Sequence, residues 1–405
     1  MLGQSRAARG SRVNRMRGGI SIQAMVAGAL AAFVGFASSF AVIIKGLTAV
    51  GASEAEAASG LMALSISMAV CGIWLSLKTR MPISIAWSTP GAALLATTGA
   101  LAGGFATAVG AFIVTGLLIV LAGLWKPLGR WVAAIPSPLA NAMLAGVLFH
   151  LCLAPVQAIA EQPAVGLAIV LTWAIVARFR RLYAVPAAVL VTVGLILATT
   201  HVSAAGMGPL WPHPVLVVPH FSIPGVVGIA LPLFIVTMAS QNIPGIAVLN
   251  VNGYRPAPGP LFSTSGVFGL AAAPFGGHAV NLAAITAALC AGEDAHPDPT
   301  RRYWAAVTAG VVYILFGLLA NAATAFISAS PPILIEAVAG LALLGAFGSS
   351  LVGATAEARD REAAVVTFLV TASGLTFFGI SGAFWGLLAG GAMFALSRWR
   401  AGPAS

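Results

Sequence analysis

An uncharged polar cluster interrupts one of the long apolar segments of this chain. Residues 237–245 read Thr-Met-Ala-Ser-Gln-Asn-Ile-Pro-Gly, so two amides, Gln241 and Asn242, stand side by side. Amides donate and accept hydrogen bonds without carrying a charge, and Pro244 leaves a nearby backbone carbonyl without its helical partner. Such groups either bind a polar ligand or bond one helix to another. We expect Gln241 and Asn242 to contact a ligand.

A second feature is a segment that changes from extended to helical. Within residues 82–101, the alternating run Ile-Ser-Ile-Ala-Trp favours an extended chain. Thr89 precedes Pro90 and is therefore disfavoured in the α region. Thr89 suits a helix N-cap, with Pro90 at the first helical position. The pattern predicts an extended arm followed by a helix that begins part-way along the segment.

Residues 274–291 repeat this plan. Pro-Phe-Gly-Gly-His at 274–278 disfavours a helix, Asn281 is a good N-cap, and residues 282–289 favour a helix. Helices that begin inside a segment present unpaired N–H groups and a positive dipole end, which together bind anions. A kink that only improves packing is the alternative. We expect an anion to lie between Thr89 and Asn281.

Aromatic and hydroxyl side chains flank this expected anion site. Trp87 and Phe275, one in each arm, either cover an aromatic ligand or pack against neighbouring helices. The residues expected to bind substrate are Ser39, Trp87, Ser88, Thr89, Gln241, Asn242, Phe275, His278 and Asn281.

Two titratable residues are candidates for carrying a coupled proton. His278 lies in the second arm, and an imidazole titrates near neutral pH. Glu336 is an acid about one turn inside an apolar segment, after Pro331 and Pro332. A packed neutral histidine and a water-facing glutamate are the alternatives.

The sequence gives no support for enzyme chemistry. It contains no P-loop, G-x-S-x-G, H-E-x-x-H or paired C-x-x-C pattern. Cys71, Cys152 and Cys290 lie in apolar runs without metal-type spacing. We expect no catalytic residue, metal or cofactor, and an ion gradient as the source of energy.

Composition indicates the surroundings of these residues. Of 405 residues, 59% are hydrophobic and 7% are charged, whereas soluble proteins carry about 25% charged residues. Most of the surface must therefore face lipid, and runs such as 105–124 and 303–327 have roughly the length of a membrane crossing. The chain is expected to be an all-α polytopic membrane protein.

Fourteen membrane segments account for the positions of the charges. If the N-terminus is cytoplasmic and every segment crosses, all basic residues except Lys45 fall on the cytoplasmic side, in agreement with the positive-inside rule. Both termini are then cytoplasmic, and the net charge of +10 reflects topology instead of nucleic-acid binding. The expected segments are 20–44, 54–77, 82–101, 105–124, 137–154, 163–177, 184–200, 225–249, 259–272, 274–291, 303–327, 331–352, 363–379 and 382–397.

The two halves of the chain are related by spacing. In the first half, Ala37-Ser38-Ser39 is followed by Gly51, and in the second half Ala239-Ser240-Gln241 is followed by Gly253 at the same distance of 14 residues from the alanine. Likewise, Pro82 precedes Thr89 by seven residues, and Pro274 precedes Asn281 by seven. Since seven segments is an odd number, the second half would be inserted upside down. The prediction is an inverted 7+7 repeat with half-helices in segments 3 and 10 and a site at the bilayer midplane.

Four strings carry a resemblance to a known family. Residues 33–40 (Phe-Val-Gly-Phe-Ala-Ser-Ser-Phe), 81–91 (Met-Pro-Ile-Ser-Ile-Ala-Trp-Ser-Thr-Pro-Gly), 238–245 and 274–281 resemble the benzoate/proton symporter (BenE) family. The resemblance extends from about residue 20 to residue 397. It implies import of benzoate with protons into bacteria, and hence a location in the bacterial inner membrane. It also implies an architecture similar to uracil/xanthine permeases and sulfate-type anion carriers.

That architecture implies a core domain from segments 1–4 and 8–11 and a gate domain from segments 5–7 and 12–14. The implied divisions are a cytoplasmic N-terminus (1–19), core (20–130 and 225–328), gate (131–204 and 329–397), an extracytoplasmic loop (205–224) and a cytoplasmic tail (398–405).

One departure from the nucleobase carriers concerns the substrate. Those carriers use acids in segments eight and ten, whereas this chain has Gln241 at the first place and no acid in 274–291. A buried carboxylate would repel an anion, so the departure fits an aromatic carboxylate and leaves the coupling residue open. The expected function is alternating-access import of benzoate, or a similar carboxylate, with protons. An uncoupled organic-anion carrier or channel and a nucleobase-type permease are the alternatives, and both a monomer and a homodimer stay open.

Overall fold

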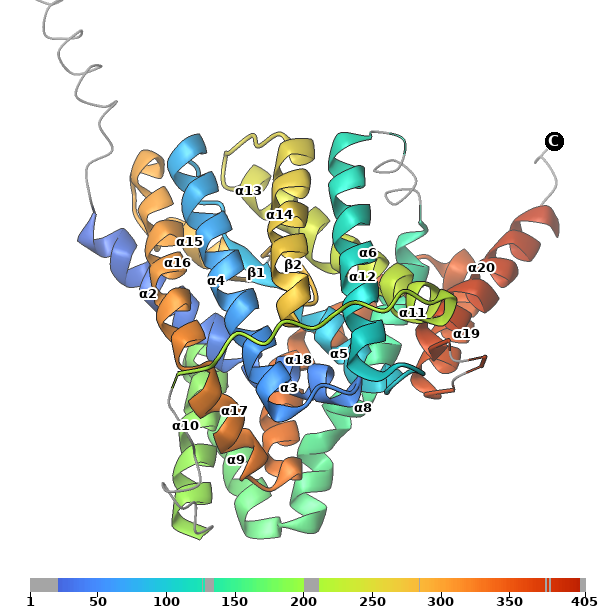
Figure 1. Ribbon diagram of the computed structural model, residues 1–405, viewed down its shortest axis with the longest axis horizontal. Coiled ribbons are helices and arrows are strands. Elements are labelled where there is room, and N and C mark those ends of the chain that lie inside the picture. Colours follow the sequence, from blue (N-terminus) through green and yellow to red (C-terminus); the bar gives the residue numbers. More distant parts are fainter. Residues whose placement is uncertain are drawn as a thin grey trace, which may run out of the picture.

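The computed structural model describes residues 21–125, 127, 135–199, 211–283, 285–375, 377–378 and 380–400. Within these ranges the chain is mostly helical (Figure 1). Seven helical stretches there are long and apolar enough to cross a membrane, and a pair of helices bent by 55°, Pro299–Leu318 with Ala320–Ser328, makes an eighth. This confirms a polytopic helical protein. The expected count of fourteen segments includes several that are too short or too broken to meet that test.

The helices of the first half cover residues up to Thr199. They are α2 (Ile22–Ala37), α3 (Phe40–Ala49), α4 (Glu54–Thr79), α5 (Thr89–Thr98), α6 (Gly104–Leu124), α8 (Ser137–Glu161), α9 (Pro163–Phe179) and α10 (Arg181–Thr199). The expected N-terminal region 1–19, most of the 125–134 connection and residues 200–210 lie outside the described residues, as does the tail beyond residue 400. Residues 200–210 comprise the end of the expected gate range and the first six residues of the expected 205–224 loop.

The second half begins with one long, irregular helical stretch. It runs through α11 (Ile223–Gly225), η2 (Val226–Ala230), α12 (Leu231–Thr237), η3 (Met238–Asn242) and α13 (Ile243–Val251). The remaining elements are α14 (Pro258–Ala272), η4 (Ala273–Phe275), α15 (Ile285–Ala291), η5 (Pro299–Arg301), α16 (Tyr303–Leu318), α17 (Ala320–Ser328), α18 (Pro332–Thr355), η6 (Ala358–Asp360), α19 (Arg361–Ala372) and α20 (Gly382–Arg400).

Prolines explain the irregular turns of that stretch. Both η2 and η3 are π-helical, and each ends just before a helix whose second residue is a proline, Pro232 or Pro244. Proline has no N–H for the i→i−4 bond, and π turns of this kind are frequent at functional sites. The polar run expected to contact a ligand therefore lies in a widened helical turn.

Two short strands, one from each arm, pair with each other near the centre of the fold (Figure 1), which corrects the all-α prediction. This pairing is the crossing of the two arms. Strand β1 (Ile85–Trp87) pairs antiparallel with β2 (Val280–Leu282), with Ala86 opposite Asn281. The pairing is extended by Ser88 N–H donating to Ala279 O (3.3 Å) and Ala283 N–H donating to Ser84 O (3.0 Å). Extended chain buried this deeply needs partners for its backbone groups. The arms supply several of these to each other.

Because of this pairing, neither Thr89 nor Asn281 is the helix N-cap that the sequence predicted. Asn281 lies in β2, and α15 begins only at Ile285, so Asn281 is not a helix cap. In the first arm the cap is Ser88, whose hydroxyl accepts a hydrogen bond from Gly91 N–H, and Thr89 is the first helical residue. The local sequence favoured a helix after Asn281, but hydrogen bonds to β1 outweigh that preference.

The repeat spacing has a counterpart in the backbone. Gly51 and Gly253, which follow α3 and α13, both have positive φ values (102° and 86°). Such a conformation strongly favours glycine. The two glycines that the spacing paired therefore occupy the same kind of helix end.

The helices pack in two groups. One contains α2–α6 with α11–α17 and both strands; the other contains α8–α10 and α18–α20. Glycines bring helices close within each group: a Cβ on Gly28 of α2 would overlap the carbonyl of Ala305, and one on Gly340 of α18 would overlap that of Leu151. Helices approach this closely in membranes through such small residues.

An extended segment crosses one face of the first group. Residues 211–222 contain no helix and run across that face towards α11 (Figure 1). Their backbone bonds to three places: Val215 N–H to Ser59 Oγ (2.9 Å), Val217 N–H to Pro274 O (2.8 Å) and His220 N–H to Ala106 O (2.9 Å). The segment thus ties the start of the second arm to α4 and α6.

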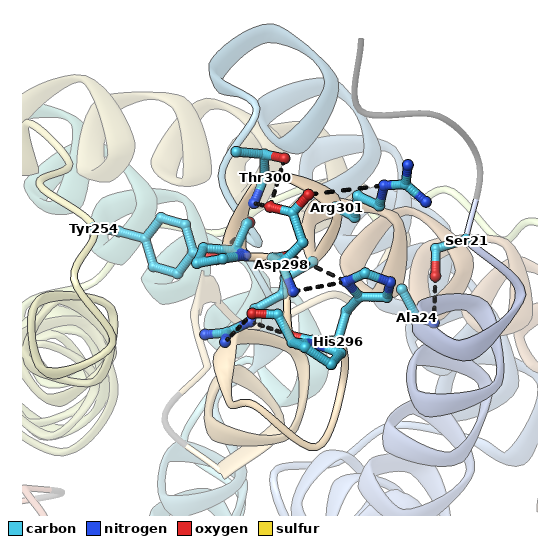
Figure 2. A network of polar contacts seen from close by, with 10 residues as sticks. Ser21, Ala24, Tyr254, His296, Asp298, Thr300 and Arg301 are labelled. Atoms are coloured by element: carbon cyan, nitrogen blue, oxygen red, sulfur yellow. Dashed lines mark hydrogen bonds and ion pairs between the residues drawn. The ribbon is translucent and has the colours of Figure 1, made fainter. Parts of the chain in front are cut away.

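The loop after α15 is organised by polar contacts (Figure 2). Asp298 accepts hydrogen bonds from the hydroxyl (2.8 Å) and N–H (2.9 Å) of Thr300, and these hold the pKa of its carboxyl below the usual range. Tyr254 donates to Pro299 O (2.9 Å). Arg302, only 4% exposed, donates to the carbonyls of His296 (2.6 Å) and Ala291 (2.8 Å). Arg302 therefore fastens the loop to the C-terminal end of α15.

Replacing Arg302 with methionine is expected to destabilise the protein by about 3 kcal/mol, because charge-assisted hydrogen bonds contribute roughly 1.5–3 kcal/mol each and buried carbonyls lose their donor. Thermal unfolding of the detergent-solubilised protein measures this as a lower Tm. The matched control is Arg301→Met. Arg301 is 3.8 Å from Asp298, and both side chains are over 40% exposed (42% and 45%), so that change should cost less than about 1 kcal/mol. Equal effects of the two substitutions would contradict this role of Arg302.

Candidate functional site

Ser88 joins three elements where the arms cross. Its hydroxyl caps α5 by accepting from Gly91 N–H (3.1 Å) and also accepts from the hydroxyl of Thr237 in α12 (2.9 Å). Its carbonyl lies 2.9 Å from His278 Nε2 in the second arm. Ser88 is completely buried, so these bonds fix the relative positions of α5, α12 and the second arm.

One ring nitrogen of His278 forms a hydrogen bond and the other has no partner among the described residues. A carbonyl only accepts, so Nε2 must carry the proton that it donates to Ser88 O, and a neutral ring then has its lone pair on Nδ1. Nδ1 is buried, and no atom of the described residues bonds to it. The ring is 1% exposed and meets Phe112 edge-on, with centroids 6.2 Å apart. A buried acceptor without a partner costs roughly 1–3 kcal/mol, so a ligand or water that donates a hydrogen bond to this nitrogen would be stabilised there.

Two buried amide side chains form hydrogen bonds at the second strand: Asn281 lies in β2, and Asn242 contacts it from η3. Asn242 Oδ1 accepts from Leu282 N–H (2.9 Å), which ties the π turn η3 to β2. Asn281 Nδ2 donates to Leu282 O (2.9 Å), while its Oδ1 is buried and bonds to no described residue. The second arm thus carries two unpaired acceptors, His278 Nδ1 and Asn281 Oδ1.

Trp87 connects the first arm to the break between α2 and α3. Its Nε1 donates to Ser39 Oγ (2.9 Å), and Ser39 in turn donates to Gly35 O (2.7 Å). The indole ring lies 5.6 Å from Phe36 and 6.3 Å from Tyr313, measured between centroids. Phe36 stacks on Phe40 at 5.3 Å. The phenylalanines are half-buried, so this aromatic cluster has an accessible edge.

A second contact between the arms was not expected from the sequence. Ser84, just before β1, bonds to Thr286 in the first turn of α15 (2.8 Å). It mirrors the contact of His278, before β2, with Ser88 at the start of α5. No sequence pattern around Ser84 or Thr286 predicts that the two side chains meet. Only the crossing of the strands brings the two hydroxyls together.

The first turn of α5 has few unpaired donors, which revises the prediction of two facing helix ends. Ser88 N–H bonds to Ala279 O, Pro90 has no N–H, and Gly91 N–H bonds to Ser88 Oγ. Among the described donors of this turn, the N–H of Thr89 is the one not accounted for, and Thr89 is half-buried. The described part of α15 has seven residues and starts after the strand, so only α5 offers an N-terminus here.

Other predicted residues lie outside the network around Ser88. Gln241 is half-buried beside Asn242. Phe275 lies in a separate hollow of about 320 Å³ with Met62, Ile66 and Phe268, so it does not share the aromatic cluster of Trp87.

Glu336 lies in a different cavity, where it forms an ion pair with Lys45 (2.6 Å). A further cavity of about 240 Å³ lies between α8 and the π turn η3 and is lined by Ser137, Asn141 and Ser240.

Comparison with known proteins gives consistent matches. The sequence profile named "Benzoate membrane transport protein" (BenE) matches residues 18–396. The chain is 42% identical over 370 residues to inner membrane protein YdcO of Escherichia coli K12, covering 91% of this chain and 94% of that one. It is 33% identical over 375 residues to a benzoate membrane transport protein of Acinetobacter baylyi, with the same coverage (91% and 94%).

Solved structures share the fold at low sequence identity. The murine anion transporter Slc26a9 in an inward-facing state matches with a TM-score of 0.63 and 13% identity, over 94% of this chain and 69% of that one. A structure of SLC26A9 matches with a TM-score of 0.61 and 12% identity, and this chain spans 65% of its length. The transmembrane domain of the cyanobacterial bicarbonate transporter BicA matches with a TM-score of 0.59 and 16% identity, over 91% and 96% of the chains.

Proposed function

The chain belongs to the benzoate membrane transport protein (BenE) family, and on that premise we propose that it imports benzoate, or a similar aromatic carboxylate, together with protons. It is a membrane transporter and not an enzyme. The observation that carries the proposal is the crossing of the two arms, which buries His278 with an unpaired Nδ1 beside the start of α5.

The carboxylate is proposed to bind at the start of α5. Thr89 offers a half-buried N–H at the positive end of a ten-residue helix, and such an end favours an anion. Ser88, Asn242 and Asn281 are the buried polar groups of the proposal, and Gln241 follows as the neighbour of Asn242 in the π turn η3. Among the described residues of this region there is no carboxylate to repel the substrate, since 274–283 and 237–245 contain no acid.

The aromatic ring is proposed to lie against the cluster that includes Trp87. Phe36 and Phe40 supply half-buried aromatic faces, and Trp87 is held in place by its bond to Ser39. Offset or edge-to-face contact with another ring adds roughly 0.5–1.5 kcal/mol to simple burial. An aliphatic carboxylate of the same size would lack this term.

The proton is proposed to bind His278 Nδ1. Protonation there converts an unpaired acceptor into a donor and places a positive charge near the carboxylate. Substrate and proton then stabilise each other in the same state, which is the thermodynamic requirement for coupled transport.

Alternating access is proposed to arise from movement between the two helix groups. We assign the group with both strands as the core and the group of α8–α10 and α18–α20 as the gate, within a fourteen-segment inverted repeat with cytoplasmic termini. The cavities beside Ser240 and beside Lys45 both border α8 or α18 of the gate. They are the proposed routes from the two sides of the membrane.

Initial uptake of radiolabelled benzoate into proteoliposomes tests the proposal. Neutral benzoic acid crosses lipid by itself, so rates must be taken above those of protein-free liposomes. An inward proton gradient of one pH unit should raise the protein-dependent rate, and a protonophore should remove the increase. Uptake that ignores the gradient would indicate an uncoupled carrier, and transport of nucleobases in place of carboxylates would overturn the substrate.

A further inference from the structure

A charged pair occupies a cavity away from the crossing of the arms. Lys45 Nζ on α3 lies 2.6 Å from Glu336 Oε1 on α18, and the two side chains are 33% and 29% exposed. The cavity around them has a volume of about 430 Å³. It therefore lies between one helix of the proposed core and one helix of the proposed gate.

The lining of this cavity suits an amphipathic anion. Ala41, Ile44, Ile335 and Ala339 provide apolar walls, while Thr48, Ser328 and Ser330 add hydroxyl groups. Lys45 and Glu336 are its charged residues. Cavities that bind small molecules have volumes of about 300–1,000 Å³, mostly apolar walls and a few convergent polar groups.

The position of Lys45 along α3 places the cavity next to the candidate site. Lys45 follows Ser39 by six residues, which is about 9 Å along a helix. Ala41 lines the cavity one turn closer to Ser39, and its neighbour Phe40 belongs to the aromatic cluster. The cavity and the aromatic cluster therefore both lie along the first turns of α3.

The ion pair of Lys45 and Glu336 is expected to contribute little to the stability of the fold. Ion pairs with this degree of exposure usually contribute little, because water screens the charges and ordering two long side chains costs entropy. In the proposed topology Lys45 is also the one basic residue of the sequence on the extracytoplasmic side. A single cation at that side is positioned to attract an anion from outside.

We propose that this cavity is an external access site for the aromatic carboxylate, in which the substrate displaces Glu336 from Lys45. This rests on the proposed function and adds the first binding step to it. Glu336 neutralises Lys45 while the site is empty. The incoming carboxylate takes the place of Glu336 on Lys45, and the displaced Glu336 carboxylate, whose side chain is 29% exposed, turns to water. The apolar walls then hold the ring until the substrate moves along α3.

Two substitutions distinguish this site from a simple clasp between helices. Lys45→Met removes the cation and should raise the KM for external benzoate about fivefold. Glu336→Gln removes the competing anion and should lower that KM about threefold. These factors correspond to the strength of a partly exposed ion pair. If the pair only held α3 against α18, both substitutions would break it and both would change uptake in the same direction.

The experiment uses right-side-out proteoliposomes of the full chain, with benzoate as the probe and Lys78→Met as the matched control. Lys78 stacks on Trp74 at 4.5 Å on α4, away from this cavity, so its replacement should leave KM unchanged. Opposite shifts for Lys45→Met and Glu336→Gln support the access site. Shifts in the same direction, or none, overturn it while leaving the proposed function intact. Absence of benzoate uptake by the wild-type protein overturns both proposals.

Discussion

Replacing His278 with glutamine is expected to abolish the stimulation of benzoate uptake by an inward proton gradient. A glutamine amide can still donate to Ser88 O and keep the arms together, but it has no basic nitrogen to replace Nδ1. With one proton coupled to each substrate, a gradient of one pH unit supplies a driving force of about tenfold in accumulation. We expect the variant to lose all of this factor and to equilibrate benzoate only.

The measurement compares initial protein-dependent uptake with and without the gradient. The matched control is His150→Gln, since His150 lies exposed on α8, away from both arms. The control should retain the full stimulation. If His278→Gln also retained it, the proton would have to enter on another group or on the substrate itself, and the role of His278 would be disproved.

Replacing Asn281 with leucine is expected to reduce uptake at least tenfold at every pH. The side chain is fully buried in β2, donates to Leu282 O and presents the unpaired Oδ1. Leucine removes both groups and leaves the carbonyl without its donor, and each lost buried partner costs roughly 1–3 kcal/mol. Uptake in proteoliposomes measures the effect, and expression with a single size-exclusion peak checks folding.

A second variant separates binding from folding at this position. Asn281→Asp keeps the size of the side chain but adds a carboxylate, which should repel the substrate and also reduce uptake. Asn250→Leu, at a half-buried position of α13, is the control and should transport normally. Normal uptake by the Asn281 variants would remove this residue from the substrate site.

Composition and local patterns were sufficient to predict the class of the protein and the approximate positions of its helices. Too few charges to cover a soluble globule require a lipid-facing surface, and this holds for any arrangement of the helices. Extended chain at 82–88 and 277–281 also followed from local chemistry, because β-branched alternation and paired glycines disfavour a helix wherever they occur, whereas Pro274 and Phe275 lie in the short helix η4. For the same reason, Gly51 and Gly253 end helices in matching conformations.

The partners of these arms depend on how the two halves of the chain pack. Ala86 lies opposite Asn281, and no pattern within either segment specifies a strand so distant in the chain. The pairing overrode the N-cap preference of Asn281, transferred the cap of α5 to Ser88 and left His278 with one unpaired nitrogen. It also separated Phe275 from Trp87, and the packing of α3 against α18 joined Lys45 to Glu336. Local propensity acts over a few residues, whereas these bonds depend on which buried polar groups meet once the two halves have packed together.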